Sequence, residues 1–301
     1  MSEYKGKVVL NYQYYKGIDG YSDGDIEEDL LALVKQESDM EKIIEKDHRW
    51  PILYHLSPVR QNILEWYQFQ PDASVLEIGA GCGAITALLA RKTKEVTCVE
   101  LSKRRSIINA ERNKNCGNVE ILVGNFNDIQ WEKKYDYITL IGVLEYASYY
   151  TEAVNPFEAF LKKIKTLLNP GGKVLIAIEN KFGLKYWAGA REDHTGYLFD
   201  GIEGYHRTDS KVYTFSQDEL RNTIKKAGFK KTYFYYPFPD YKFPSKIFSE
   251  DYLPKAEELV YSPLSYDNDR IILFNETAAY HELVKCGKFE FFSNSFLVEA
   301  D

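Results

Sequence analysis

The chain has 301 residues, of which 45% are hydrophobic and 28% are charged, and this composition argues against a disordered or coiled-coil protein. Its formal net charge of −7 disfavours nonspecific binding to nucleic acid, because a negative field repels polyanions. By length, either one large domain or two small domains would fit.

The four cysteines are widely spaced and form no Cys-x-x-Cys pair, so they suggest neither a zinc site nor a disulfide framework. The N-terminus lacks a basic start followed by a long apolar segment. No apolar run approaches the roughly 20 residues that span a bilayer. We therefore expect a soluble cytoplasmic protein with no membrane insertion.

An aromatic lead of about 24 residues opens the chain. Apolar residues from Ile26 to Ile44 then recur near a period of 3.6, which predicts an amphipathic helix. Ser57-Pro58 offers a cap and a first-turn proline for a second helix, reaching to about Phe69. We expect residues 1–56 to form a helical extension or lid, and residues 57–301 to form one α/β domain.

From residue 74 onward, apolar β runs alternate with helical patterns. This alternation predicts a doubly wound, mostly parallel, seven-stranded sheet with helices on both faces. The predicted strands are 74–78, 95–99, 119–123, 135–141, 173–178, 231–236 and 295–299, and the predicted helices are 83–91, 102–113, 156–168 and 216–227. Segments 180–214 and 237–268 are long for plain connections and are expected to be lids or binding loops.

The strongest motif is the run Val75-Leu-Glu-Ile-Gly-Ala-Gly-Cys-Gly-Ala84, an apolar strand that enters a glycine-rich turn and then a helix. Gly79, Gly81 and Ala84 also satisfy the dinucleotide fingerprint G-x-G-x-x-G/A. Glu100, at the end of the next strand, is a candidate ribose ligand for either type of cofactor.

Glu77 and the tight G-x-G-x-G spacing separate the two cofactor hypotheses. With these residues, and with the following Val96-Thr-Cys-Val-Glu100, the chain resembles the class I S-adenosylmethionine-dependent methyltransferases over residues 57–236 and the final strand. The resemblance implies S-adenosylmethionine as cofactor, with Glu77 beside its ammonium group and Glu100 on its ribose hydroxyls. The cofactor-binding residues that it implies are Glu77, Gly79, Ala80, Gly81, Gly83, Glu100, Leu101, Asn125, Phe126 and Gly142.

Asn125 and Phe126 follow the third predicted strand. Asn125 lies where the family usually has Asp, so the carbonyl for the adenine amine is kept and the charge is lost. Phe126 either stacks on the adenine ring or packs in the core.

The fourth-strand motif ends in Glu145-Tyr146, with Tyr146 where many relatives have His, and it lacks the Asn/Asp-Pro-Pro-aromatic signature of many methylases acting on nucleobase or amide nitrogen. Together with the net charge, this favours methylation of a hydroxyl oxygen, which needs positioning and often a base. Among His55, His194 and His206, we select His194, which lies in the first insertion. Glu145 is the second predicted catalytic residue, although a helix-start carboxylate is an equal alternative.

No metal is predicted, because the spacing of Asp193, His194, Asp200, Glu203 and His206 matches no defined ligand pattern. The aromatic stretch 233–241 offers rings that could stack on sugar faces, and a packed strand and turn explains it equally well.

The run Glu179–Ala190, continued through Asp193-His194 to Ile202, resembles bacterial methyltransferase domains that accompany glycosyltransferases in surface polysaccharide assembly. That resemblance implies a saccharide or saccharide-phosphate acceptor and fusion to or association with a glycosyltransferase. The net charge and the missing fourth-strand signature lead us to expect a small-molecule or glycan acceptor and no nucleic-acid partner. Because a predicted strand ends almost at Asp301, we also expect the chain to be a domain of a longer protein. Two alternatives stay open: an NAD(P)-dependent oxidoreductase or epimerase acting on a nucleotide sugar, and a non-catalytic cofactor-binding module.

Overall fold

A computed structural model describes residues 2–207, 209–263 and 269–301 of the chain. Residue 208 of the predicted insertion 180–214 and residues 264–268 of the insertion 237–268 lie outside this description. The chain divides into two compact units. The first comprises Met1–Ile141 and Thr166–Val174, and the second comprises Gly142–Lys165 and Leu175–Asp301.

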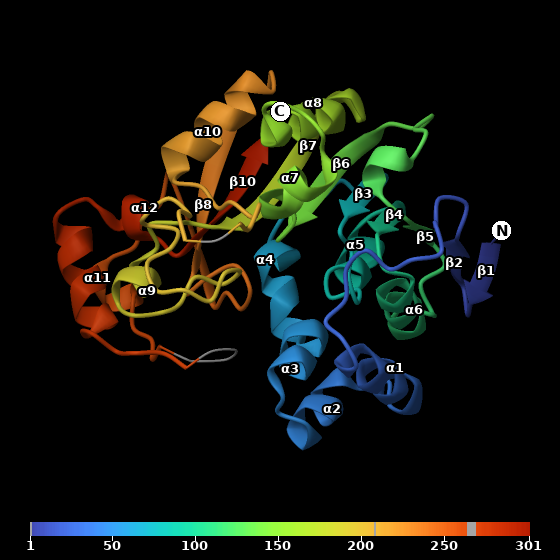
Figure 1. The fold of residues 1–301 in the computed structure, drawn as a ribbon, viewed down its shortest axis with the longest axis horizontal. Coiled ribbons are helices and arrows are strands. Elements are labelled where there is room, and N and C mark those ends of the chain that lie inside the picture. The colour runs from blue at the N-terminus through green and yellow to red at the C-terminus, as the bar shows by residue number, and fades with distance from the viewer. Residues whose placement is uncertain (1, 208, 264–268) are drawn as a thin grey trace. The chain divides into compact units, whose positions relative to one another are not determined.

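The described residues form ten strands (Figure 1). These are β1 (Ser2–Lys5), β2 (Val8–Asn11), β3 (Ser74–Ile78), β4 (Glu95–Glu100), β5 (Val119–Val123), β6 (Tyr135–Ile141), β7 (Leu168–Glu179), β8 (Thr232–Phe238), β9 (Lys246–Ser249) and β10 (Ser295–Ala300). In the first unit the order is β1-β2-β5-β4-β3-β6 followed by the start of β7, and in the second it is the rest of β7 followed by β10-β8-β9.

The predicted α/β class is confirmed, but the predicted count of seven strands was wrong. All seven predicted strands form, and β1, β2 and β9 are added to them. Each added strand has only four residues, too few to show a clear period of two.

Twelve α-helices accompany these strands in the described chain, and several are single turns. They are α1 (Ile26–Gln36), α2 (Met40–Lys46), α3 (Trp50–Leu56), α4 (Asn62–Glu65), α5 (Thr86–Lys92), α6 (Lys103–Arg112), α7 (Ala147–Tyr150), α8 (Pro156–Thr166), α9 (Leu184–Trp187), α10 (Gln217–Lys226), α11 (Glu276–Lys285) and α12 (Phe289–Phe292). Among the described residues, no helix has both the length and the apolar character needed to cross a membrane.

The predicted helix over Ile26–Ile44 is two helices, because Asp39 caps a new start. Its side chain accepts hydrogen bonds from the backbone amides of Glu41 and Lys42, which begins α2. The predicted helix from Ser57 to about Phe69 is also shorter than expected. It consists of a 3-10 turn, Pro58–Gln61, followed by the single turn α4.

The centre of the first unit is the parallel set β5-β4-β3-β6. Ser74 to Ile78 of β3 lie opposite Glu95 to Val99 of β4, and β3 pairs with β6 on its other side. All five residues of β3 are buried, as expected for a parallel strand covered on both faces. The strand order reverses between β3 and β6, so the carboxyl ends of the strands around this point are where an open α/β sheet binds its ligand.

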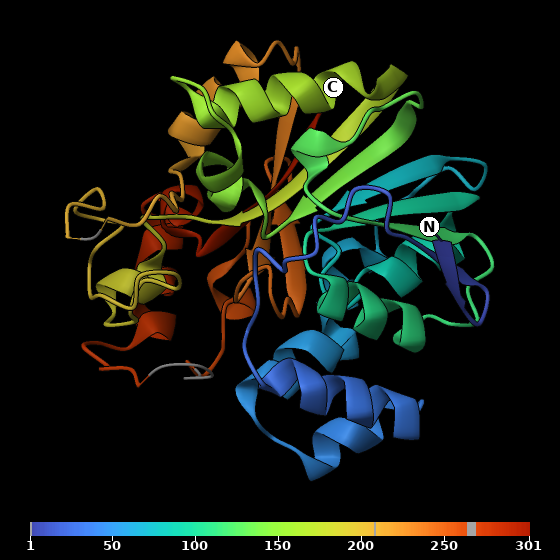
Figure 2. The ribbon, with the colours of Figure 1, turned by 45° about the vertical axis from the view of Figure 1, so that its right-hand side comes forward.

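The N-terminal helices of the first unit pack on α6. An apolar cluster joins Leu30 and Val34 of α1 to Ile52 of α3 and Ile108 of α6. The lead that precedes α1 passes from β2 toward these helices as an extended segment (Figure 2). It lies close to the ends of β4 and β5, because a side chain at Gly20 would contact Leu101 and one at Gly124 would contact the backbone of Tyr14.

An aromatic core fills the second unit. Phe234, Tyr236, Tyr280 and Phe296 are fully buried, and the rings of Phe234 and Tyr236 each pack edge-on against Phe296. Much of the stretch 233–241 that could have stacked on a sugar therefore packs inside the protein, with Phe238 and Tyr241 also buried. These rings stabilise the second unit through the large apolar area that each removes from water.

Candidate functional site

The glycine-rich turn after β3 is held by the end of β4. The amides of Gly79 and Ala80 both donate to the carbonyl of Val99, at 2.9 and 3.2 Å. Gly83 adopts a φ of +79°, and a Cβ there would lie 2.4 Å from Oδ1 of Asn109. Gly81 has a φ of +52°, and no atom lies within 4 Å of the position that its Cβ would occupy. The turn therefore has one tightly packed glycine and one that faces open space, where a ligand can approach the backbone.

Glu100 joins this turn to the start of α6. Its Oε2 accepts from the amide of Gly81 at 2.8 Å, and its Oε1 accepts from the amide of Ser102 at 2.9 Å. Burial raises the pKa of Glu100 above its ordinary value, against the lowering effect of Arg105. A carboxylate can accept about four hydrogen bonds, and Glu100 accepts from the backbone amides of Gly81, Leu101 and Ser102, so it keeps capacity for a hydroxyl donor such as a ribose.

Glu77 lies inside the unit rather than on its surface. Its Oε2 accepts from the hydroxyl of Thr86 at 2.6 Å and from the thiol of Cys98 at 3.3 Å. Burial raises the pKa of Glu77 to about 7. Its carboxylate therefore titrates near neutral pH, and a cation bound beside it would favour the charged form.

Two further predicted cofactor residues follow β5. Asn125 Oδ1 accepts from the amide of Asn127 at 2.9 Å and so caps a 3-10 turn over Phe126–Asp128. Phe126 is buried and its ring packs against Trp131 at 5.5 Å between centroids. The amide of Gly124 donates to the carbonyl of Glu100 at 2.8 Å, which brings the ends of β4 and β5 together.

The lead segment covers the start of α6 in a way that the sequence did not predict. Asp19 accepts from the amide of Lys103 at 2.7 Å and from the hydroxyl of Ser102 at 3.2 Å. Arg105 then forms ion pairs with Asp23 and with the fully buried Glu27. Because 84 residues separate Asp19 from Lys103, no local pattern indicates this contact.

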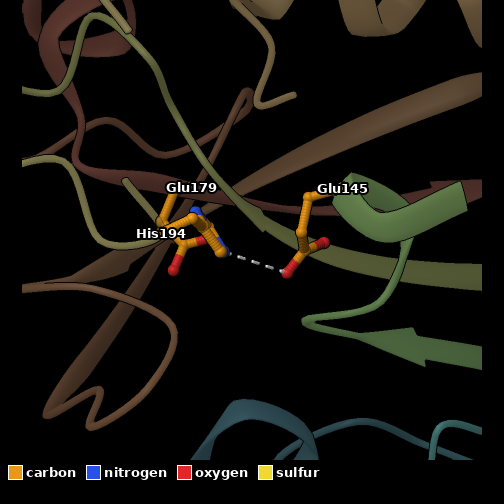
Figure 3. Close-up of side chains that lie close together, drawn as sticks. All are labelled: Glu145, Glu179 and His194. Atoms are coloured by element: carbon orange, nitrogen blue, oxygen red, sulfur yellow. Dashed lines mark ion pairs between the residues drawn. The ribbon is translucent and has the colours of Figure 1, made fainter. Parts of the chain in front are cut away.

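The predicted catalytic residues meet in the second unit, together with a third residue (Figure 3). Glu145, Glu179 and His194 each offer a ligand atom, and these atoms all lie within 4.8 Å of one another. His194 Nε2 is 3.8 Å from Oε1 of Glu145. All three side chains are almost completely buried, at 1%, 1% and 8% exposure.

Glu192 orients the imidazole of His194. Its Oε1 lies 3.1 Å from His194 Nδ1, and its Oε2 accepts from the amides of His194 and Thr195, both at 2.7 Å. The Nδ1 nitrogen therefore donates to Glu192, and Nε2 faces Glu145. Burial alone would lower the pKa of His194, but the carboxylates of Glu145 and Glu192 outweigh it and raise this pKa well above its ordinary value.

Two lysines offset part of the negative charge. Lys242 forms ion pairs with Glu179 Oε1, at 2.8 Å, and with Asp193. Lys185 pairs with Asp193 at 2.8 Å and more distantly with Asp240 at 3.7 Å. Burial would raise the pKa of Asp193, but these two ammonium groups hold it well below its ordinary value.

The two other candidate histidines are not part of this cluster. His55 is buried in the first unit, 2.8 Å from Asp23, and His206 is exposed in the second. Gly142, predicted to bind the cofactor, follows β6 with a φ of +70° and lies beside the cluster. A Cβ on Gly142 would lie 2.8 Å from the hydroxyl of Tyr241 and 3.6 Å from Oε1 of Glu145.

Sequence reasoning missed Glu179, Glu192 and both lysines as parts of this cluster. One signal for Glu179 was present, because it ends a strand, as Glu100 does, and open α/β sheets bind ligands at the carboxyl ends of their strands. Glu192 lies two residues from His194, but such a spacing outside a regular helix or strand does not indicate which side chains meet.

A parallel sheet with a glycine turn after β3 and a carboxylate at the end of β4 defines the class of nucleoside-cofactor enzymes. A family model described as a methyltransferase domain matches residues 52–233, and the chain belongs to this family. Membership confirms the cofactor predicted from the sequence, S-adenosylmethionine.

Individual relatives agree with this family. An uncharacterized methyltransferase of Staphylococcus carnosus is 32% identical over 161 residues, which cover 52% of this chain and 70% of the relative. A ribosomal RNA small subunit methyltransferase A of Malacoplasma penetrans is 31% identical over 83 residues, 27% of this chain and 30% of that protein.

Among solved structures, a Haemonchus contortus phosphoethanolamine N-methyltransferase 1, in complex with phosphoethanolamine and S-adenosylhomocysteine, matches with a TM-score of 0.50 and 13% identity. The match covers 92% of this chain and 48% of that one, so this chain spans about half the length of that enzyme. At this identity the likeness concerns the fold alone.

Proposed function

We propose that the protein transfers a methyl group from S-adenosylmethionine to a hydroxyl of a saccharide, saccharide-phosphate or other small-molecule acceptor. The binding of this cofactor is supported by one observation: Glu100, at the end of β4, accepts a hydrogen bond from the amide of Gly81 in the glycine turn. In this proposal the ribose hydroxyls donate to Glu100, the backbone from Gly79 to Gly83 surrounds the methionine portion, and Glu77 lies beside the ammonium group. Leu101, Asn125, Phe126 and Gly142 complete the predicted contacts.

The acceptor half rests on Glu145 and His194. Methyl transfer forms a bond between the hydroxyl oxygen and the methyl carbon while the carbon–sulfur bond breaks, and its electron pair stays on sulfur to give S-adenosylhomocysteine. The hydroxyl must lose its proton, and a positioned base accelerates this step. Glu145 and His194 are buried and adjacent, and Glu192 fixes the imidazole. This suits Glu145 to receive the proton and His194, with its raised pKa, to position the hydroxyl.

The choice of acceptor rests on chemistry and on resemblance. The net charge of −7 disfavours a polyanionic substrate, although one relative is named as a ribosomal RNA methyltransferase. The run from Glu179 to Ile202 resembles domains that accompany glycosyltransferases, and this favours a saccharide and association with such an enzyme. The buried carboxylates and imidazole of the second unit offer the polar groups that orient a hydroxyl-rich ligand.

Calorimetry with S-adenosylhomocysteine tests the cofactor assignment. Glu100→Ala is expected to lower the affinity by more than about tenfold, or 1.4 kcal/mol. Glu95→Ala is the matched control, because Glu95 begins the same strand and pairs only with Lys133 at the surface. Unchanged affinity in Glu100→Ala, or no binding by the parent protein, would contradict the assignment.

A substrate screen tests the acceptor. Purified protein and labelled S-adenosylmethionine are incubated with saccharides, saccharide-phosphates, small amines and ribosomal RNA, and the products are identified by mass spectrometry. We expect label on a saccharide hydroxyl, strongly reduced in His194→Ala and in Glu145→Gln. Transfer only to an amine or to RNA would overturn the acceptor proposal and leave the cofactor assignment intact.

A further inference from the structure

We propose that Glu145, Glu179 and His194 bind a divalent metal ion. This differs from the sequence-based expectation of no metal, which considered only ligands within the segment 193–206. The three residues come from separate parts of the second unit: Glu145 from a 3-10 turn after β6, Glu179 from the end of β7, and His194 from the segment after α9. Their placement together is visible only in the folded chain (Figure 3).

Unsatisfied oxygens are the first observation that points to a ligand. Within the described chain, Oε2 of Glu145 and Oε2 of Glu179 accept no hydrogen bond although both atoms are buried. A buried carboxylate oxygen without a partner is costly, and proteins rarely keep one unless an ion or a water completes it. Both carboxylates belong to the same three-residue cluster, in which Oε1 of Glu145 faces His194, so one ion reaches Oε2 of Glu145 by bidentate binding or by rotation of the carboxylate.

The orientation of His194 is the second observation. Metal-bound histidines donate their other ring nitrogen to a carboxylate or carbonyl, which fixes the tautomer and leaves the remaining nitrogen as the ligand. Glu192 holds Nδ1 of His194 in this way, at 3.1 Å, and Nε2 is directed toward Glu145. Glu192 is itself fixed by two backbone amides and by the hydroxyl of Tyr205.

The charge balance also favours a cation. Glu145, Glu179, Glu192, Asp193 and Asp240 supply five carboxylates, against the two ammonium groups of Lys185 and Lys242. Both lysines pair with Asp193, and of the three proposed ligands only Glu179 contacts a lysine. A divalent ion would supply positive charge that the two lysines do not.

Ligand type and spacing indicate which ion fits. Two carboxylates and one imidazole suit Mn²⁺ or Zn²⁺ better than Mg²⁺, which prefers oxygen ligands alone. Ligand atoms bound at about 2.0–2.2 Å in tetrahedral geometry lie about 3.3–3.6 Å apart, so the cluster, whose atoms lie within 4.8 Å of one another, must close by up to about 1.5 Å. Three protein ligands leave coordination positions open for another molecule.

The role of the ion in catalysis, unlike its binding, rests on the proposed function. An acceptor hydroxyl that binds at an open position has a lower pKa, because the ion stabilises the alkoxide. The proton passes to a carboxylate of the cluster, and the oxygen then attacks the methyl carbon as described above. With an ion bound, Glu145 and His194 would act as metal ligands, and they would position the acceptor through the ion.

Metal binding can be measured without any methyl transfer. The purified full chain is treated with a chelator, dialysed and titrated with Mn²⁺ alone, with free Mn²⁺ followed by electron paramagnetic resonance, and then with Zn²⁺ alone by calorimetry. We expect one ion per chain for the parent, and at least about tenfold weaker binding for Glu179→Gln and His194→Ala. Glu250→Gln, whose carboxylate pairs with Arg221 instead, is the control and should bind as the parent does.

The outcomes separate this proposal from the proposed function. No binding of either ion by the parent, or equal binding by the parent and Glu179→Gln, overturns the metal site whatever the enzyme does. If His194→Ala fails to fold, judged by circular dichroism, the parent and Glu179→Gln still decide. Binding of S-adenosylhomocysteine is measured on the same samples. Metal binding with no transfer to any hydroxyl overturns the proposed function and leaves the metal site standing.

Discussion

Glu100 accepts a hydrogen bond from the backbone amide of Gly81, a residue 19 positions earlier in the chain. The end of β4 thereby fixes the shape of the turn that follows β3. Since Glu100 also accepts from Ser102, one carboxylate orders both the glycine turn and the start of α6. This part of the proposed cofactor site is therefore held by the protein's own hydrogen bonds, which reduces the ordering cost of binding.

Replacing Gly83 or Gly81 of this turn by alanine should lower the free energy of unfolding by different amounts. In Gly83→Ala the new Cβ would meet Asn109, and the positive φ adds strain, so we expect a loss of about 2–5 kcal/mol in the free energy of unfolding. Gly81→Ala meets open space and should lose only about 1–2 kcal/mol, from its positive φ. Urea denaturation measures both.

Cofactor affinity provides the complementary measurement for this pair. Gly81→Ala places a methyl group where the cofactor is proposed to approach, so it should bind S-adenosylhomocysteine at least about tenfold more weakly while remaining folded. Calorimetry on the folded variant decides this point. Full affinity in Gly81→Ala would mean that the cofactor does not approach the turn there.

Glu77 should make the protein less stable as the pH rises. Its folded-state pKa of about 7 exceeds the ordinary value of 4.5, so its contribution is fully present below pH 4.5 and is lost as the pH rises through 7. Glu77→Gln removes this dependence. The variant should be more stable than the parent by about 2–3 kcal/mol at pH 8, with the difference shrinking toward pH 5. Urea denaturation of both proteins across this range, without cofactor, tests the sign. A difference that is constant with pH would show that Glu77 does not titrate as described.

Arg105 should contribute more to stability than its neighbour Arg104. Arg105→Ala leaves the fully buried Glu27 without its closest cation, and removing one partner of a buried pair costs about 3–5 kcal/mol. Arg104 is more exposed and lies 4.0 Å from Glu27, so Arg104→Ala should cost less than about 1 kcal/mol. Urea denaturation compares the variants, and limited proteolysis should show faster cleavage of the lead in Arg105→Ala. Similar losses in both variants would contradict the importance of the Glu27 pair.

Removing the hydroxyl from two tyrosines of the aromatic core should change the stability of the protein by different amounts, although both side chains are completely buried. Tyr236 donates to Glu290 at 2.7 Å and accepts from Gln217 at 3.0 Å, so Tyr236→Phe should lose about 1–3 kcal/mol. The hydroxyl of Tyr280 makes only a long contact, 3.4 Å, with the carbonyl of Phe292, so Tyr280→Phe should stay within about 0.5 kcal/mol of the parent. Thermal unfolding with both variants checks this. A larger loss in Tyr280→Phe would reverse the ranking.

The sequence predicted the central strands well, because buried parallel strands are continuous apolar runs between turn signals. The strands β3, β5 and β6 have the predicted bounds, and the cofactor class followed from Glu77, Glu100 and the glycines between them. Prediction failed where the structure depends on distant partners. The strand β1 is mostly exposed and has no apolar alternation, and it forms because β2 pairs with it and with β5.

The candidate site in the second unit was predicted only in part for the same reason. Glu145 and His194 were identified individually, but their proximity depends on the path of the segment after α9. Glu179 lies in the run that resembles the family's domains, and that resemblance does not single it out as a strand-end carboxylate. The stretch 233–241 suggested rings that stack on sugar faces, because a sequence shows which residues are present and not which are buried.

The pairing of β2 with β5 also affects how the protein folds as it is synthesised. Val9 lies opposite Glu120, so β2 must find an edge that is synthesised 111 residues later. At about 5–20 residues per second, the β1-β2 hairpin exists for several seconds before that edge emerges. Pairings of such high sequence separation slow folding, and an unpaired strand edge can associate with other chains in the meantime. The hairpin therefore completes its pairing in the first unit only after β5 has been synthesised.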